Sequence, residues 1–446
     1  MAGGIFNLAQ KKIRPGTYVN VVNGRQPAAE AATTGIGCIP LIGYDWGPRG
    51  QFFQLSAASP DAEQAKLGRS VYSDNSHMRM LALMLMGAAT LYVYIPDAGT
   101  KATKTQTNGE GNLVVTAKYK GTLGNGITLV SVANPTAGFD VSVVLDGQEV
   151  ERFEGVTDFA NIVSDYVDIS GTETTAVAFA GLTLTGGTNT ASGETVNAGV
   201  AAFLDASEKV HFNCMCFPSA ETSLQTALRT KIKYIRETIG WKCQAVAPNF
   251  AADYEGIINL TNSFRYDDTD LTTAEACAWL AGVTAGADFT TSNTYVAVVG
   301  AEAVVGEKTH EASEAAIKAG QAFFTVDDDG SVILETDINS LVTHGTKPAD
   351  AHKNRPLRVY DQFCNDCLVT FKPNKFSGDE TGYQIIEGMG RAMLMAYQAA
   401  GAIQNVDAEA DFVVDRGQSI GDYVVINVGL QSVDSIEKYY ITVIAR

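Results

Sequence analysis

The stretch VHFNCMCFPSAETSLQTALRTKIKYIRETIGWKCQAVA, residues 210–247, decides the fold class of this chain. Residues 210–217 form a strand-like apolar run, and residues 243–247 form a second one. Between the two runs, five apolar residues recur at the spacing of one helix face: Leu224, Leu228, Ile232, Ile235 and Ile239. A strand, a helix and a strand in succession predict an α/β unit in which helices cover a sheet.

The alternation of helices and strands continues toward the carboxyl end. Thr272 and Glu275 have the spacing of a capping box and precede the apolar run 276–281, so a helix is expected there. A further apolar run, 295–299, takes the place of the next strand in this alternation.

Residues 80–95 are the most membrane-like part of the chain, but they are shorter than the roughly 18 apolar residues that span a bilayer. They predict a core helix up to residue 89 and a buried strand at 91–95. With the elements above, they define a three-layer α/β core of residues 26–96 and 195–350.

Residues 97–194 interrupt this core with a composition rich in Gly, Thr, Val and Asn. The turn signals Asn125-Gly126 and Asp146-Gly147 accompany three short apolar runs: 113–119, 127–133 and 141–145. The pattern predicts an all-β domain inserted into one loop of the core.

The last part of the chain combines helical and β patterns. Residues 323–326 and 332–335 flank an Asp-Asp-Asp-Gly hairpin turn, and a separate α+β domain is expected at 351–446. Its expected elements are two helices and two β-type runs: 357–371, 383–404, 423–428 and 439–444. The predicted fold is therefore multi-domain mixed α/β: a three-layer core, an inserted β domain and a carboxyl-terminal assembly domain.

Composition limits the classes of partner. Lys and Arg total 32 against 50 Asp and Glu, and the net charge of -18 repels both nucleic acid and anionic lipid. Only 18% of residues are charged, which suits burial against other protein. The beginning of the sequence lacks a secretory signal and the seven Cys are an odd number, so reduced thiols in a cytosolic compartment are expected.

Motifs that could carry catalysis are incomplete. Residues 417–421 match the G-x-S-x-G pattern of a hydrolase, but every His precedes Ser419, whereas that fold places its base after the nucleophile. Residues 306–309 have Glu307 inside a phosphate-loop-like sequence, and Asp327 to Asp329 lack the spacing of a calcium loop. No catalytic residue and no cofactor are predicted.

Two cysteine pairs are candidate metal or redox sites. Cys364 and Cys367 form a single CxxC inside a helical pattern, and Cys214 and Cys216 alternate in a strand. No second ligand pair stands at zinc-finger spacing, so both pairs are interpreted as buried thiols and no metal site is predicted.

Several longer stretches together resemble the tail sheath proteins of contractile phages and phage-like particles. They are RPGTYVN (14–20), TTAEACAWLAGVTAG (272–286), EAAIKAGQAFF (314–324), DDDGSVILETDINSLVTH (327–344), KNRPLRVYDQFCNDC (353–367) and parts of 401–443. The resemblance covers most of residues 270–446 and the first 25, and little of the inserted domain.

The resemblance implies a structural subunit rather than an enzyme. Such subunits assemble as stacked six-membered rings around a tail tube and contract to drive the tube through a target envelope. The implied partners are further copies of this chain, the tube protein, and baseplate and tail terminator proteins. The implied location is the virion tail, after assembly in the host cytoplasm. The inserted domain is expected on the outside of the assembly.

The resemblance also implies that terminal arms join neighbours by adding strands to their sheets. Residues 1–25 would be one arm, pairing with the runs 423–428 and 439–444. The predicted connector residues are Arg14, Thr17, Tyr18, Val19, Asn20, Val21, Tyr423, Val425, Tyr439, Tyr440, Ile441 and Val443. Four basic residues and no acid precede Glu30, whereas residues 407–446 carry seven acids against three bases, so the two ends attract.

Two other functions remain open from the residues alone. One is an α/β hydrolase or redox enzyme with an unrecognised site. The other is a monomeric α/β protein that binds a ligand in a cleft between domains.

Overall fold

The computed structural model describes residues 31–189 and 193–445, so the predicted amino-terminal arm lies outside the described residues. The described chain divides into two compact units. The larger unit comprises Ala32–Leu368 and the final segment that begins at Ser432, and the smaller unit comprises Val369–Gln431.

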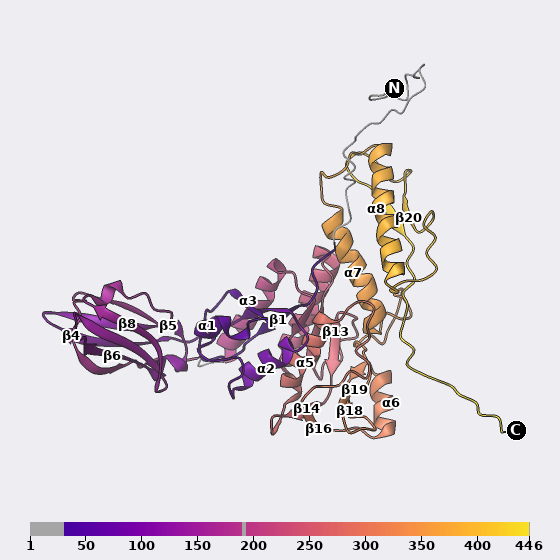
Figure 1. The fold of residues 1–446 in the computed structure, drawn as a ribbon. Coiled ribbons are helices and arrows are strands. Elements are labelled where there is room, and N and C mark those ends of the chain that lie inside the picture. The colour runs from indigo at the N-terminus through magenta and orange to yellow at the C-terminus, as the bar shows by residue number, and fades with distance from the viewer. Residues whose placement is uncertain (1–30, 190–192, 446) are drawn as a thin grey trace, which may run out of the picture. The chain divides into compact units, whose positions relative to one another are not determined.

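The larger unit is built on a seven-stranded sheet with the order β17-β13-β12-β11-β1-β3-β2 (Figure 1). Its strands are β1 (Ile36–Pro40), β2 (Phe52–Ser56), β3 (Thr90–Tyr94), β11 (Cys214–Cys216), β12 (Gln244–Pro248), β13 (Ile257–Leu260) and β17 (Gln321–Ala322). Neighbouring strands are parallel except β2 and β3. Every residue of β11, β12 and β13 is buried, as expected for parallel strands covered on both faces.

Helices cover this sheet on two sides, which confirms the predicted three-layer core (Figure 1). The helices α2 (Ser76–Leu85) and α5 (Thr273–Gly286) pack on one side, and α3 (Gly193–Ala206) and α4 (Thr222–Tyr234) pack on the other. The capping box of α5 is formed: the Thr272 hydroxyl accepts from the N–H of Glu275, whose carboxylate accepts from the N–H of Thr272. The α4 helix continues as one π-helical turn, Ile235–Ile239.

Smaller elements complete the larger unit. They are α1 (Gln64–Leu67), β14 (Ser263–Tyr266), β15 (Thr269–Asp270), β16 (Ala301–Val305), α6 (His310–Lys318), β18 (Phe324–Val326), β19 (Val332–Leu334) and most of α7 (Asn354–Thr370). The predicted hairpin of β18 and β19 is confirmed. The predicted strand at 295–299 is wrong: Tyr295 has a φ of 63°, which interrupts extended backbone, and only Ala297 bridges to Ile333.

The inserted segment folds as two facing β-sheets (Figure 1). One sheet has the order β10-β6-β7-β8 and the other β4-β5-β9. The strands are β4 (Lys101–Asn108), β5 (Gly111–Lys120), β6 (Ile127–Ala133), β7 (Phe139–Leu145), β8 (Gln148–Val156), β9 (Val167–Gly171) and β10 (Phe179–Thr183). Asp146 and Gly147 make the predicted hairpin turn, with φ angles of 48° and 84°, whereas Asn125-Gly126 ends a 3₁₀ turn.

The smaller unit consists of the helix α8 (Glu380–Ala399) and a strand pair, β20 (Phe412–Val414) and β21 (Ile426–Val428). Phe412 packs directly on α8 at Gly390, where a Cβ would lie 2.2 Å from the aromatic ring. The predicted β run 423–428 is a strand only over its last three residues.

The predicted β run 439–444, in the final segment, is wrong for this single chain, because none of its residues belongs to a strand. Throughout the part of the chain that the structure describes, every helix is too short or too polar to cross a bilayer.

Candidate assembly surfaces

Ser419 serves a turn rather than a catalytic site. Its hydroxyl donates to the carbonyl oxygen of Asp415 at 2.6 Å and accepts from the N–H of Val425 at 2.9 Å. The Asp415 carboxylate accepts from the N–H groups of Gln418 and Gly417, which hold the pKa of Asp415 below its usual value. Because the hydroxyl is bonded in both directions, it is poorly placed to act as a nucleophile.

The prediction of buried thiols is confirmed for Cys214 and Cys216, but it is wrong for Cys364, which is exposed, and Cys367 is half-buried. Cys364 and Cys367 lie one turn apart on α7, and burial raises the pKa of Cys367 to about 12. Cys214 and Cys216 are fully buried in β11, where burial raises the pKa of both thiols well above the usual value. A thiol that stays protonated at neutral pH is a poor nucleophile and metal ligand.

The acidic motif Asp327 to Asp329 also forms a turn. The N–H of Gly330 donates to the carbonyl oxygen of Asp327, and the N–H of Ser331 donates to the Asp329 carboxylate at 2.8 Å. Within residues 31–189 and 193–445, no three His, Cys, Asp or Glu side chains form a group that could hold a metal ion.

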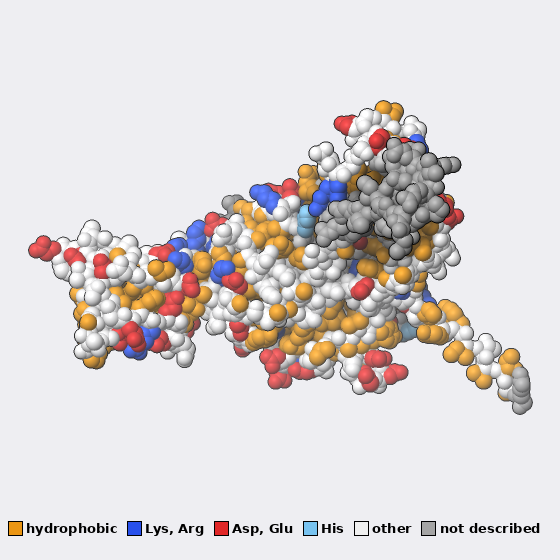
Figure 2. Space-filling view, turned by 45° about the horizontal axis from the view of Figure 1, so that its top comes forward, with side chains coloured by type: hydrophobic (Ala, Val, Ile, Leu, Met, Phe, Trp, Pro, Cys, Tyr) orange, Lys and Arg blue, Asp and Glu red, His pale blue; other side chains and the backbone are white. Residues whose placement is uncertain are grey.

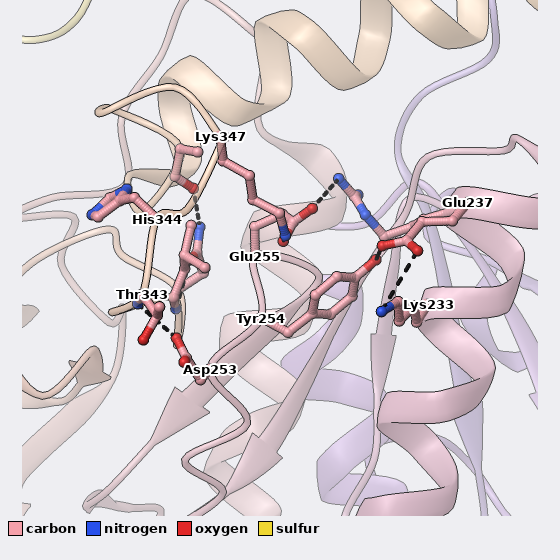
Figure 3. Close-up of polar contacts among 12 residues, drawn as sticks. Lys233, Glu237, Asp253, Tyr254, Glu255, Thr343, His344 and Lys347 are labelled. Atoms are coloured by element: carbon pink, nitrogen blue, oxygen red, sulfur yellow. Dashed lines mark hydrogen bonds and ion pairs between the residues drawn. The ribbon is translucent and has the colours of Figure 1, made fainter.

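A polar network that no sequence motif indicated joins the π-helical turn after α4 to α7 and to two loops, whose residues Figure 3 shows. Arg236 is only 4% exposed and donates to Asp361 from Nη1 and Nη2, at 2.6 and 2.9 Å. Glu255 lies 4.0 Å from Arg236 and pairs with Lys347, whose ammonium lies 4.7 Å from the ring centre of Tyr254. Each charged side chain of this network lies beside an opposite charge, so the network fastens α7 and the two loops to the end of α4.

The strand pair of the smaller unit is held on α8 by Arg416. Its guanidinium group contacts Glu380 at 2.7 Å and Glu387 at 2.8 Å. Glu387 also accepts from the N–H of Val414 at 2.9 Å. The hydrogen bond from Arg416, together with that from Val414, lowers the pKa of Glu387. The β20–β21 pair is therefore a well-anchored platform.

The outer edge of β21 is open, whereas that of β20 faces α8, where Glu387 accepts from the N–H of Val414. Among the described residues, β20 and β21 pair only with each other. The predicted connector residue Tyr423 is 53% exposed, whereas Val425 is half-buried and bonded through its N–H and carbonyl groups to Ser419 and Asp415. An open edge presents backbone N–H and C=O groups that can pair with a strand from another chain.

The final segment carries the other predicted connector residues of the carboxyl end, and its side chains are uncovered. Tyr439 is 75% exposed, Tyr440 92%, Ile441 82% and Val443 88%. Figure 2 shows these hydrophobic side chains along the projecting end of the chain, at its lower right. Soluble proteins rarely leave so many large apolar side chains in a continuous patch unless the patch contacts a partner.

Three family models match successive parts of the chain. Residues 97–189 match the phage tail sheath protein beta-sandwich domain, residues 193–340 the phage tail sheath protein central domain, and residues 346–446 the phage tail sheath C-terminal domain. The sandwich match includes the insert, which carried little of the resemblance seen in the residues. These matches place the chain among the structural proteins of phage tails.

Relatives over the full length agree. The chain is 32% identical over 479 residues to the phage-like element PBSX protein XkdK of Bacillus subtilis (strain 168), with 99% of each chain covered. The crystal structure of a sheath tail protein from Desulfitobacterium hafniense matches with a TM-score of 0.82 and 34% identity, over 96% of this chain and 99% of that one. This chain belongs to the phage tail sheath protein family, as the resemblance predicted.

A more distant assembly shares the fold alone. The helical sheath of the anti-feeding prophage in its contracted state has a TM-score of 0.57 and 12% identity, with 98% of this chain and 99% of that one covered.

Proposed function

We propose that this chain polymerises as stacked hexameric rings around a tail tube and contracts to drive the tube through a target envelope. Its partners are further copies of itself, the tube protein, and baseplate and tail terminator proteins. It acts in the tail of a virion or phage-like particle after assembly in the host cytoplasm, and it catalyses no reaction. Nucleic acid and membrane are not partners.

Two features of the structure carry this proposal: an uncovered apolar arm and an open sheet edge. Residues 438–445 have exposed side chains, and among the described residues the outer edge of β21 pairs with no strand. A strand added to such an edge gains backbone hydrogen bonds, and its alternating side chains fix the register. The side chains of the arm lie exposed on their own subunit, so the sheet edge that accepts the arm belongs to a neighbouring copy.

The amino-terminal arm is the second connector. Arg14 and the residues Thr17 to Val21 carry this role, and the arm's four basic residues complement the acidic carboxyl end. Such exposed charges steer association and are screened by salt. The sheet edge and the run 439–444 of a neighbour are the acceptors of this arm.

The inserted β domain occupies the periphery of the assembly. Its two ends adjoin core elements, at residue 95 and near residue 210, as a loop insertion requires. Replacing it with a short Gly/Ser bridge is expected to leave a soluble core that unfolds cooperatively. Loss of cooperative unfolding in that core would contradict an independent insert.

Electron microscopy of concentrated protein tests the proposed function. The full chain is expected to form rings or ribbed tubes. A variant without residues 1–24, and one in which Tyr440, Ile441 and Val443 become Ser, are expected to stay folded and monodisperse. Unchanged tube formation by both variants would refute the connector roles, and a monodisperse monomer at high concentration for the full chain would refute polymerisation.

A further inference from the structure

The final segment of the chain has two parts: a held half, residues 432–437, and a free half, residues 438–445. Residues 438–445 have exposed side chains, whereas several side chains between Ser432 and Glu437 are engaged with the larger unit. The contrast within fourteen residues indicates that the segment is fixed at its root and free beyond it.

Lys353, the residue immediately before α7, contacts both acidic residues of the held half. Its ammonium nitrogen lies 2.6 Å from the Asp434 carboxylate and 2.7 Å from that of Glu437. The side chains of the lysine and of Glu437 are 23% and 19% exposed, so water screens this pair less than a surface pair. Burial acts to lower the pKa of Lys353, but the hydrogen bonds to Asp434 and Glu437 outweigh it and raise that pKa.

Two further hydrogen bonds, each between a charged group and a hydroxyl, lie beside this ion pair. The Glu437 carboxylate also accepts from the Thr294 hydroxyl at 3.1 Å, and Arg355 donates from Nη1 to the Ser435 hydroxyl at 3.1 Å. We call Thr294, Lys353 and Arg355 the clamp, and the segment that they hold, residues 432–437, the root of the carboxyl-terminal arm.

Side chains alone make this attachment. Among the described residues, no backbone-to-backbone hydrogen bond joins residues 433–437 to the rest of the larger unit. A β ladder would impose one register on the arm, whereas side-chain contacts fix its position and leave its backbone free to pair elsewhere. Ile436, between the held residues, is 73% exposed and plays no part in the attachment.

We propose that Lys353 is the positioning residue of the carboxyl-terminal arm: the clamp fixes the root so that residues 438–445 leave the subunit at one place and reach a neighbouring copy. This inference rests on the proposed function and adds the residues that set the arm's origin. A fixed root reduces the conformational freedom lost when the arm docks, which favours assembly without a new contact.

The test uses the full chain labelled with carbon-13 in the isoleucine δ-methyl groups. In dilute protein, the Ile436 methyl is expected to be ordered, and the Ile441 and Ile444 methyls mobile. In Lys353→Ala, Ile436 is expected to become as mobile as Ile441, and the concentration at which tubes appear is expected to rise about tenfold.

Two further variants separate positioning from general damage. Lys318→Ala removes a lysine whose only described ion pair, with Glu314, is highly exposed, and is expected to change neither readout. Lys353→Glu combined with Asp434→Lys and Glu437→Lys reverses the charges and is expected to restore both.

An ordered Ile436 in Lys353→Ala would overturn the clamp. A mobile Ile436 with unchanged tube formation would overturn the positioning role while leaving the sheath function intact. If the unmodified chain forms no tubes, the proposed function fails, and the methyl signals still decide whether the clamp exists.

Discussion

Removing the carboxylate of Asp361 is expected to lower the free energy of unfolding of the larger unit by about 3 kcal/mol. The side chains of Arg236 and Asp361 are 4% and 15% exposed and share two short hydrogen bonds. Breaking a buried pair by removing one partner costs about 3–5 kcal/mol, because the remaining charge stays buried. In Asp361→Ala, Arg236 keeps its 2.8 Å hydrogen bond to the Cys243 carbonyl and lies 4.0 Å from Glu255. These contacts place the expected loss at the lower end of the range.

Urea unfolding followed by tryptophan fluorescence measures this loss of stability in the larger unit. All three Trp residues, Trp46, Trp241 and Trp279, belong to the larger unit. Asp270→Ala is the matched control, because the Arg265–Asp270 pair also has a 2.7 Å contact but its side chains are 47% and 52% exposed. We expect no measurable change in that variant, because water solvates both charges.

A double variant identifies the physical cause. Arg236→Met with Asp361→Leu removes both charges and keeps much of the volume, so its stability is expected to lie much closer to that of the unmodified chain. If the double variant is as unstable as Asp361→Ala, lost packing rather than an unpaired charge is responsible. Equal losses in Asp361→Ala and Asp270→Ala would refute the argument from burial.

Three further outcomes are expected. Gly390→Ala forces a Cβ into the ring of Phe412 and should destabilise the smaller unit by about 1–3 kcal/mol. Hydrogen exchange of the α8 amides measures this loss. Gly388→Ala is the control, because a Cβ at position 388 would meet open space. The pKa of Glu387 is lowered in the folded state, so its contribution to stability is complete above the usual glutamate pKa of about 4.3 and is lost as pH falls through the lower folded value. Hydrogen exchange of α8 against pH measures this loss, and Glu387→Gln should remove that part of the pH dependence. Thr272→Ala removes the cap of α5 and should cost about 0.5–2 kcal/mol by tryptophan fluorescence, whereas Thr272→Ser should cost little.

The sequence by itself determined the elements that depend on neighbouring residues. The helical spacing from Leu224 to Ile239, the Thr272–Glu275 capping box and the Asp-Asp-Asp-Gly hairpin all appear in the structure. Each depends on contacts between residues a few positions apart, so the local pattern carries the information. The longer resemblance to tail sheath proteins also came from the residues, and the family comparisons confirm it.

Tertiary structure decided which residues far apart in the chain meet. Arg236 and Asp361 are 125 positions apart, and Lys353 meets Asp434 81 positions later. Neither pair has a local signal, because a charged residue at one position is compatible with many partners until packing selects one.

Strand formation depended on partners in the same way. The runs 295–299 and 439–444 have β-type composition, yet neither forms a strand in this chain. The first is interrupted at Tyr295 by a positive φ angle, and the second pairs with no strand among the described residues. A helix satisfies its backbone hydrogen bonds within one segment, but a strand needs an edge supplied from elsewhere, so only the folded chain and its neighbours determine where strands form.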